Sequence, residues 1–282
     1  MIPTLTAIHF LISYGCSAAC DHCFLWGSPG RAGMSARQVE GWLEEIPGLG
    51  TVTGACAEGG EAFTRYPVVS HFVRRAGALG LSPSALTNAY WVRSRGVGER
   101  RMGELAAAGL TRLGVSTDQW HRRHVPERRV ELLLEICARM GVEASRMETK
   151  LEGVMFRGRA AARLAGAMPA HPPEELTTCP HEKLAAPSRV HLDCYGRLHL
   201  CQGLNVGRGS LREAIAGYHP ECHPIVRPLL EGGPYALARL AAQRGFVPAA
   251  GYADGCHLCY RAREFLRPIF PDLLGPDEMY GG

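Results

Sequence analysis

The chain has 282 residues, of which 46% are hydrophobic and 21% are charged, and its formal net charge is +4. This composition supports a sizeable buried core and excludes a wholly disordered chain. Of the 31 basic residues, only Lys150 and Lys183 are lysines. The basic residues form short runs such as RRHVPERR rather than a long stripe, so we expect no nucleic-acid partner.

The sequence shows neither a signal peptide nor a membrane span. The apolar run at 7–13 is too short to cross a bilayer, and no basic segment precedes it. We therefore expect a cytoplasmic protein with no membrane partner. Thiols stay reduced in the cytoplasm, so the eleven cysteines indicate metal or redox chemistry rather than structural disulfides.

Short apolar runs alternate with segments of helical periodicity along the first two thirds of the chain. Strands are predicted at 7–13, 51–57, 84–88, 111–117, 142–148 and 189–195, and helices at 35–46, 66–80, 98–109, 127–141 and 158–166. Repeated strand–helix alternation predicts an α/β fold, a partial (β/α)6 TIM-like barrel with parallel strands. Chemistry in such a barrel is expected at the C-terminal ends of the strands.

The composition changes near residue 168, where the proline-rich stretch MPAHPPEE begins. Six of the eleven cysteines follow it, among many glycines and prolines. We predict a barrel domain over 1–168, to which the sixth strand at 189–195 is added later in the chain. The remainder, 169–282, is predicted to be a small cysteine-rich domain that is stabilised by metal rather than by a large core.

Three cysteines, Cys16, Cys20 and Cys23, lie directly after the first predicted strand with the spacing C-x3-C-x2-C. Zinc sites and ferredoxin-type clusters typically use four thiolates. Three thiolates on one loop can hold three irons of a [4Fe–4S] cluster, and the fourth iron then remains open to bind a substrate through nitrogen and oxygen. The missing fourth cysteine therefore need not be a defect, and a zinc loop or incidental thiols are the alternatives.

This cysteine loop, followed by EGGEAF after the second strand, resembles the radical S-adenosylmethionine (radical SAM) enzymes. The resemblance implies that the three cysteines bind a [4Fe–4S] cluster whose open iron chelates the methionine part of SAM. It also implies the activity. One electron from the cluster cleaves SAM to a 5′-deoxyadenosyl radical, which takes a hydrogen atom from the substrate.

The same resemblance assigns cofactor-binding roles to residues near the cysteines. His22 matches a position near the adenine of SAM. Gly59, Gly60 and Glu61 match the glycine-rich turn that binds the methionine part, where glycines allow a close approach of the backbone. The family usually has proline at the next position, and this chain has Ala62.

Polar residues at the ends of later strands are further candidates that the resemblance implies. Asn88, Ser116 and Asp118 are expected to contact SAM, and His121 is a candidate for contact with the substrate. Glu148 ends the fifth predicted strand, and we expect it to contact the ribose of SAM or the substrate. The alternative is a solvent-exposed strand end. For Asp118 the alternative is an ordinary helix N-cap.

Two isolated cysteines lie outside these motifs. Cys56, on the second strand, either packs as a small buried residue or faces the barrel as a hydrogen-atom donor. Cys137 has core spacing within LLLEICARM and is expected to pack.

The late cysteines resemble the SPASM and Twitch extensions of radical SAM enzymes. In these extensions a hairpin carries G-x4-C, which Gly196–Cys201 matches, and later cysteines complete an auxiliary [4Fe–4S] cluster. The late cysteines are too few for two such clusters, so the resemblance implies one. Its expected ligands are Cys179, Cys201, Cys256 and Cys259, with Cys194 and Cys222 as rivals. A structural zinc site made of the same residues is the alternative.

Together these features predict a radical SAM oxidoreductase or transferase whose auxiliary cluster assists oxidation, substrate binding or sulfur insertion. We expect a small-molecule substrate in natural-product biosynthesis, because the first strand begins by residue 7 and leaves no room for a domain that docks a leader peptide. The alternative within the class is a peptide maturase that forms a crosslink or epimerises a residue. An iron–sulfur electron-transfer protein or a zinc-binding module is the alternative from another class. An external donor such as flavodoxin or ferredoxin would supply the electron.

Overall fold

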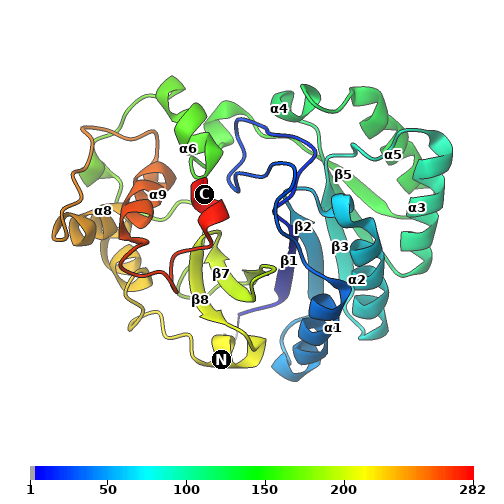
Figure 1. Cartoon of the computed structure of the whole chain (residues 1–282), viewed down its shortest axis with the longest axis horizontal. Coiled ribbons are helices and arrows are strands. Elements are labelled where there is room, and N and C mark those ends of the chain that lie inside the picture. Colours follow the sequence, from blue (N-terminus) through cyan, green and yellow to red (C-terminus); the bar gives the residue numbers. More distant parts are fainter. Residues whose placement is uncertain (1–3) are drawn as a thin grey trace.

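The computed structural model describes residues 4–282, and one eight-stranded sheet runs through the molecule (Figure 1). Its strand order is β5-β4-β3-β2-β1-β6-β7-β8. The first six strands pair in parallel, and β6, β7 and β8 pair as an antiparallel meander. The strands are β1 Ala7–Ser13, β2 Gly54–Gly59, β3 Ser82–Thr87, β4 Arg112–Ser116, β5 Glu143–Met147, β6 Arg189–Leu192, β7 Arg197–Cys201 and β8 Leu204–Arg208. The predicted α/β class, a partial barrel followed by a cysteine-rich extension, is confirmed.

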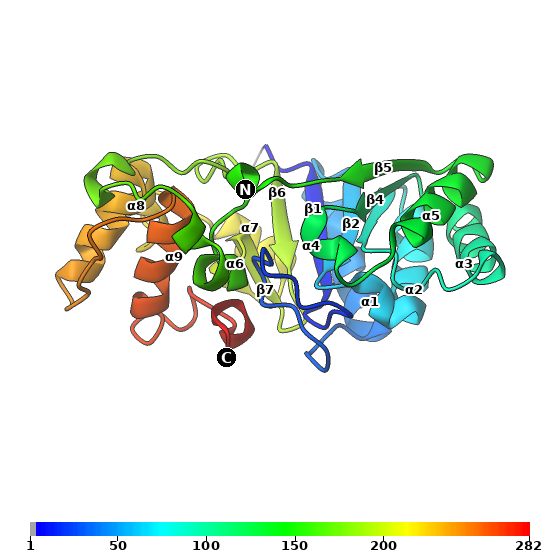
Figure 2. The same cartoon turned by 90° about the horizontal axis from the view of Figure 1, so that it is seen from above.

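The longer helices lie in two groups toward opposite ends of the molecule (Figures 1 and 2). Four of them, α1, α2, α3 and α5, cover the outer face of β1 to β5, while α8 and α9 pack together beyond β7 and β8. The helices are α1 Ala36–Glu45, α2 Tyr66–Ala78, α3 Arg95–Ala107, α4 Gln119–Arg122, α5 Glu127–Arg139, α6 Arg159–Arg163, α7 Leu211–Ala216, α8 Val226–Ala242 and α9 Gly255–Leu266.

The start of α1 follows from its sequence. Ser35, the expected N-cap, accepts a hydrogen bond from the backbone N–H of Gln38, and the Gln38 side chain accepts one from the Ser35 N–H at 2.9 Å. This capping box satisfies two N–H groups that the first turn would otherwise leave without partners. The cap fixes where the loop that carries the first three cysteines ends.

The sixth strand lies between β1 and β7 and pairs in parallel with β1 rather than with β5. The connection from β5 to β6 runs over residues 148–188 and contains the five-residue helix α6. It crosses the cysteine loop, where the Ala160 N–H donates to the carbonyl of Cys23 at 3.3 Å.

The core of the barrel half lies between the sheet and its outer helices. Phe72 of α2 is fully buried and packs against Phe10 of β1, with ring centroids 5.1 Å apart. We expect Phe72→Ala to lower the free energy of unfolding by about 3–5 kcal/mol, because it removes buried apolar surface and leaves a cavity. Urea unfolding of this variant measures the loss. The exposed Val247 provides the control, since Val247→Ala should change stability by less than about 0.5 kcal/mol.

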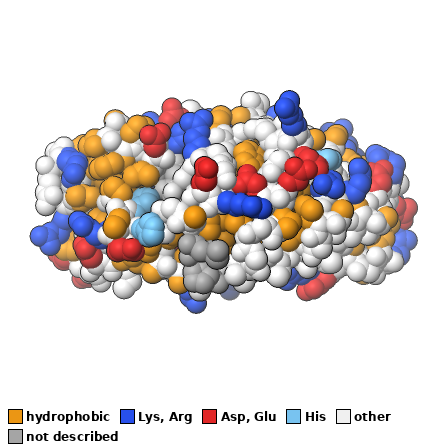
Figure 3. Space-filling model, turned by 90° about the horizontal axis from the view of Figure 1, so that it is seen from below, with side chains coloured by type: hydrophobic (Ala, Val, Ile, Leu, Met, Phe, Trp, Pro, Cys, Tyr) orange, Lys and Arg blue, Asp and Glu red, His pale blue; other side chains and the backbone are white. Residues whose placement is uncertain are grey.

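Within residues 4–282 no helix combines the length and apolar character that crossing a bilayer would require. Figure 3 shows one face of the molecule, on which basic and acidic side chains are interspersed. Such a mixed surface lacks the clustered positive charge that attracts a phosphate backbone.

Candidate active site

The loop between β1 and α1 lies across the C-terminal ends of the parallel strands, between α4 and α6 in Figure 1. Cys16, Cys20 and Cys23 all line one cavity there, with an empty volume of about 1010 Å³ that includes space open to solvent. The backbone N–H of Ala18 donates to Cys16 Sγ at 3.4 Å, and that of Gly27 donates to Cys23 Sγ at 3.3 Å. Hydrogen bonds of this kind stabilise thiolates, so the donor set suits an iron–sulfur cluster.

The two glycines at the end of β2, Gly59 and Gly60, hold this loop against the sheet. Gly59 has φ +140°, and a Cβ there would lie 2.3 Å from the carbonyl oxygen of Ser13. A Cβ on Gly60 would lie 2.7 Å from the carbonyl oxygen of Gly15, and the Gly60 N–H donates to the Ser13 carbonyl at 2.7 Å. The close approach that requires glycine is therefore made to the cysteine loop itself, and both glycines also line the cavity.

Glu61 lines the cavity and joins the ends of β2 and β3. Its buried carboxylate accepts hydrogen bonds from Thr87 Oγ1 at 2.8 Å and from the Asn88 N–H at 2.6 Å. Burial raises the pKa of Glu61 to about 7, although these hydrogen bonds act in the opposite direction. The side chain is thus fixed in place, with one face toward the cavity.

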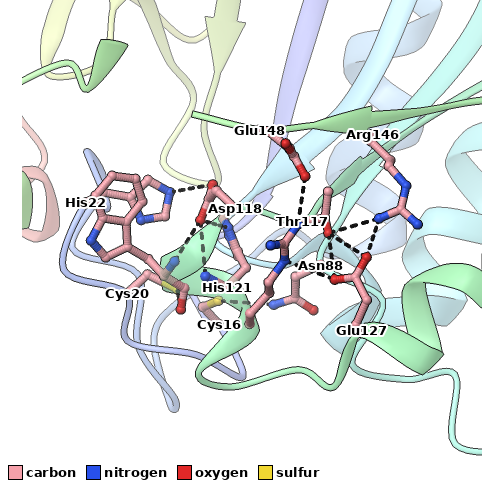
Figure 4. A network of polar contacts seen from close by, with 12 residues as sticks. Cys16, Cys20, His22, Asn88, Thr117, Asp118, His121, Glu127, Arg146 and Glu148 are labelled. Carbon is pink, nitrogen blue, oxygen red and sulfur yellow. Dashed lines mark hydrogen bonds and ion pairs between the residues drawn. The ribbon is translucent and has the colours of Figure 1, made fainter. Parts of the chain in front are cut away.

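Asp118 organises the opposite wall of the cavity (Figure 4). It caps α4 and its carboxylate contacts His121 Nδ1 at 2.9 Å and His22 Nε2 at 3.3 Å. Burial disfavours its charged form, but the two histidines more than compensate and hold the pKa of Asp118 below its usual range. His22 also stacks on Trp120, with centroids 4.6 Å apart. Asp118 therefore both caps α4 and lines the cavity.

His22 supplies a test of whether a cofactor fits. Its Nδ1 atom is buried and has no hydrogen-bond partner among residues 4–282. Buried polar atoms are normally satisfied, so this atom indicates a group that the cavity accommodates. A flat imidazole held by Asp118 and Trp120 is suited to an aromatic base such as adenine.

The remaining sequence predictions for this site divide into two groups. Asn88 and Ser116 line the cavity, and Asn88 Nδ2 donates to Ser17 Oγ on the cysteine loop at 3.3 Å. Glu148 does not line this cavity. It is half exposed and pairs with Arg122 at 2.8 Å. Successive residues of an extended chain point to opposite sides, and here the neighbours on either side of Glu148 line the cavity instead.

The isolated cysteines are both buried. Cys137 packs in the core on α5, as predicted. Cys56 lies deeper in the barrel beside His9 and Glu58, away from the residues that line the cavity. Burial raises the pKa of the Cys56 thiol to about 12, which keeps it protonated.

Arg159 binds the backbone of the cysteine loop. It was not named as a site residue from the sequence. Its buried guanidinium donates to the carbonyl of Cys20 at 3.1 Å and to that of Gly27 at 2.8 Å. Gly158, with φ +58°, allows the close approach, because a Cβ there would lie 2.5 Å from the backbone of Phe24. The signal in the sequence was the segment FRGRAA, which places two arginines beside a glycine in apolar surroundings.

The four predicted auxiliary ligands line a second, smaller cavity of about 340 Å³. Cys201 ends β7, Cys256 and Cys259 lie one turn apart on α9, and Cys179 comes from the segment before β6. The rivals lie elsewhere: Cys194 is in the turn after β6, which ends at Leu192, and Cys222 is exposed. Neither rival is among the residues that line this cavity.

Two buried arginines, Arg157 and Arg263, also line the second cavity and test what fits there. Their Nε atoms have no hydrogen-bond partner within the described residues. Burial raises the pKa of Cys259 to about 11 and that of Cys256 well above its usual value, so the free thiols are neutral. Buried cations require compensating negative charge. A metal group that binds the four cysteines as thiolates supplies that charge.

The chain thus combines a partial parallel barrel, a three-cysteine loop after its first strand and an antiparallel meander from β6 to β8, and solved structures share this fold. One solved structure with this fold is BtrN in complex with AdoMet and 2-DOIA. It is 12% identical to this chain, with a TM-score of 0.57, and the match covers 81% of this chain and 88% of BtrN. At this identity the match establishes the fold alone.

A second solved structure, a histidine-tagged form of anSMEcpe with bound AdoMet, matches with a TM-score of 0.48 and 12% identity, over 95% of this chain and 97% of the other. No protein-family model matches the chain, and the search of curated proteins found no match.

The network around Asp118 gives a prediction for cofactor affinity. We expect Asp118→Asn to weaken SAM binding about tenfold, because hydrogen bonds to a charged group are lost and His22 is no longer held. Calorimetry of the iron-loaded protein measures the dissociation constant. Glu148→Gln makes the same chemical change outside the cavity and should leave the constant unaltered. Equal affinities for all three proteins would contradict this role.

Proposed function

We propose that this protein is a radical SAM enzyme that oxidises a small molecule, with a SAM-binding [4Fe–4S] cluster on Cys16, Cys20 and Cys23 and one auxiliary [4Fe–4S] cluster on the four late cysteines. One observation carries the proposal. The seven cysteines divide into a set of three and a set of four, and each set lines its own cavity. A set of three leaves one iron open, whereas a set of four completes the ligation of a cluster.

The residues of the chain bind and orient the reactants. When bound, SAM and its cluster supply the acceptor for one hydrogen atom of the substrate, and the auxiliary cluster supplies the acceptor for the electron that remains after a proton leaves. His22 offers its ring to the adenine, and Asp118 fixes that ring. Glu61 and the glycine turn fix the floor of the site. Leu86, Val154 and Met155 form apolar walls that limit the access of water.

Complete ligation of the auxiliary cluster favours oxidation over the other roles that such a cluster has. A cluster that anchors a substrate or gives up a sulfur atom needs an iron without a protein ligand. With all four cysteines of the second cavity as ligands, the cluster would have no such iron. An electron acceptor, in contrast, needs only a protected cluster with a suitable potential.

The first cavity supports a small substrate, because it is open to solvent beside the three cysteines and a compact molecule can enter it next to SAM. BtrN was solved with 2-DOIA as well as AdoMet, which supports a second ligand next to SAM here. We propose flavodoxin or ferredoxin as the external electron donor.

The proposal is tested by product analysis. Iron-loaded protein, SAM and dithionite are incubated anaerobically with candidate substrates that are chosen from the products of neighbouring genes. We expect a product that lacks two hydrogen atoms of the substrate, and deuterium at the oxidised carbon should appear in 5′-deoxyadenosine. A crosslinked or epimerised product from a short peptide encoded nearby would favour the peptide maturase instead. A product that has gained sulfur would contradict the oxidation.

A further inference from the structure

Two buried arginines face the auxiliary cysteines, although iron–sulfur ligation itself requires no cation. We infer that Arg157 and Arg263 raise the reduction potential of the auxiliary cluster and thereby set it as an electron acceptor. This inference rests on the proposed function, because it assumes that the four cysteines hold the cluster.

Arg157 approaches the cavity from the segment between β5 and α6. Its side chain is 3% exposed, and its guanidinium donates to Cys201 Sγ. The nearest carboxylate oxygen, on Glu182, is 3.9 Å from Nη2, which is too far for a hydrogen bond. The guanidinium also lies over the ring of Phe24, 5.3 Å from its centroid, on the loop that carries the first cysteine set. Arg157 is thus directed at a ligand, and Glu182, which also lines the cavity, balances part of its positive charge.

Arg263 reaches the same cavity from α9, four residues after Cys259. It is 1% exposed and donates to the backbone carbonyl of Gln202 at 3.1 Å, next to Cys201. Within residues 4–282 no carboxylate oxygen lies within 4.0 Å of it. Two guanidinium groups from different elements therefore converge on the region of Cys201, and among residues 4–282 only that of Arg157 has a carboxylate within 4.0 Å.

Positive charges close to an iron–sulfur cluster raise its reduction potential. An oxidised cubane cluster with four thiolate ligands is already an anion, and reduction adds one more negative charge in a buried environment. A nearby cation stabilises the reduced form more than the oxidised form, and hydrogen bonds to a ligand sulfur act in the same direction. Both arginines consequently favour uptake of an electron by this cluster.

The test measures the potential of the auxiliary cluster alone. In a Cys16→Ala, Cys20→Ala, Cys23→Ala background, the cluster is titrated anaerobically and followed by electron paramagnetic resonance. We expect Arg157→Gln and Arg263→Gln each to lower the equilibrium constant for reduction at least about tenfold, which is about 59 mV for one electron. Arg157→Lys and Arg263→Lys keep the charge and should retain most of the potential. Arg261→Gln, an exposed position on the same helix, is the matched control and should leave it unchanged.

The outcomes separate this inference from the proposed function. If the triple variant binds no cluster, the proposed function fails. If the cluster forms and all variants share one potential, the inference alone is overturned. If one glutamine variant does not assemble a cluster, the reduction potentials of the other glutamine variant and of the two lysine variants test the inference by the same titration.

Discussion

Replacing Cys16, Cys20 and Cys23 together with alanine is expected to abolish reductive cleavage of SAM and to halve the iron content, from about eight to about four atoms per chain. The three thiols line one cavity, separate from the cavity of the late cysteines, so only one cluster should be lost. Iron analysis of anaerobically reconstituted protein and chromatography of 5′-deoxyadenosine measure the two effects.

Cys137→Ala is the control for this change, since Cys137 is buried in the core away from both cavities. It should retain both clusters and SAM cleavage. If the triple variant still formed 5′-deoxyadenosine, the assignment of the SAM-binding cluster would be wrong.

Cys201→Ala or Cys259→Ala is expected to separate SAM cleavage from product formation. Loss of one ligand should leave about four irons per chain, with 5′-deoxyadenosine still formed but no oxidised product, because the electron from the substrate has no acceptor. Iron analysis and product analysis on the same samples test this expectation.

The two rival cysteines are matched controls for the auxiliary site. Cys194 lies in the turn after β6 and Cys222 is exposed, so alanine at either position should retain about eight irons. Loss of iron in the Cys222→Ala protein would contradict the ligand set. If the protein contained zinc and only about four irons per chain, the second cavity would hold a structural zinc site and not an auxiliary cluster.

Local sequence signals predicted much of this molecule. Strand–helix alternation predicted the parallel core, and this prediction is confirmed because strand periodicity is a local property of the chain. Local spacing indicated the first cysteine set, and the resemblance to auxiliary-cluster extensions indicated the second. Each set lines one cavity, and the role of these cysteines as ligands stays a prediction.

Features that depend on long-range packing were not predictable in the same way. The place of β6 beside β1 depends on a connection that crosses the cysteine loop, which no local pattern encodes. The outward direction of Glu148 depends on where β5 ends, and a shift of one residue reverses the side it faces. Arg157 and Arg159 were assigned no role from the sequence, yet both are buried against the cysteine sites.

The most direct test of the central claim is the fate of SAM on the reconstituted wild-type protein. The protein is loaded with iron and sulfide under anaerobic conditions, mixed with SAM and dithionite, and analysed for 5′-deoxyadenosine and methionine. The radical SAM assignment predicts both products in equal amounts, dependent on the reductant. Intact SAM in a sample that holds both clusters would contradict it.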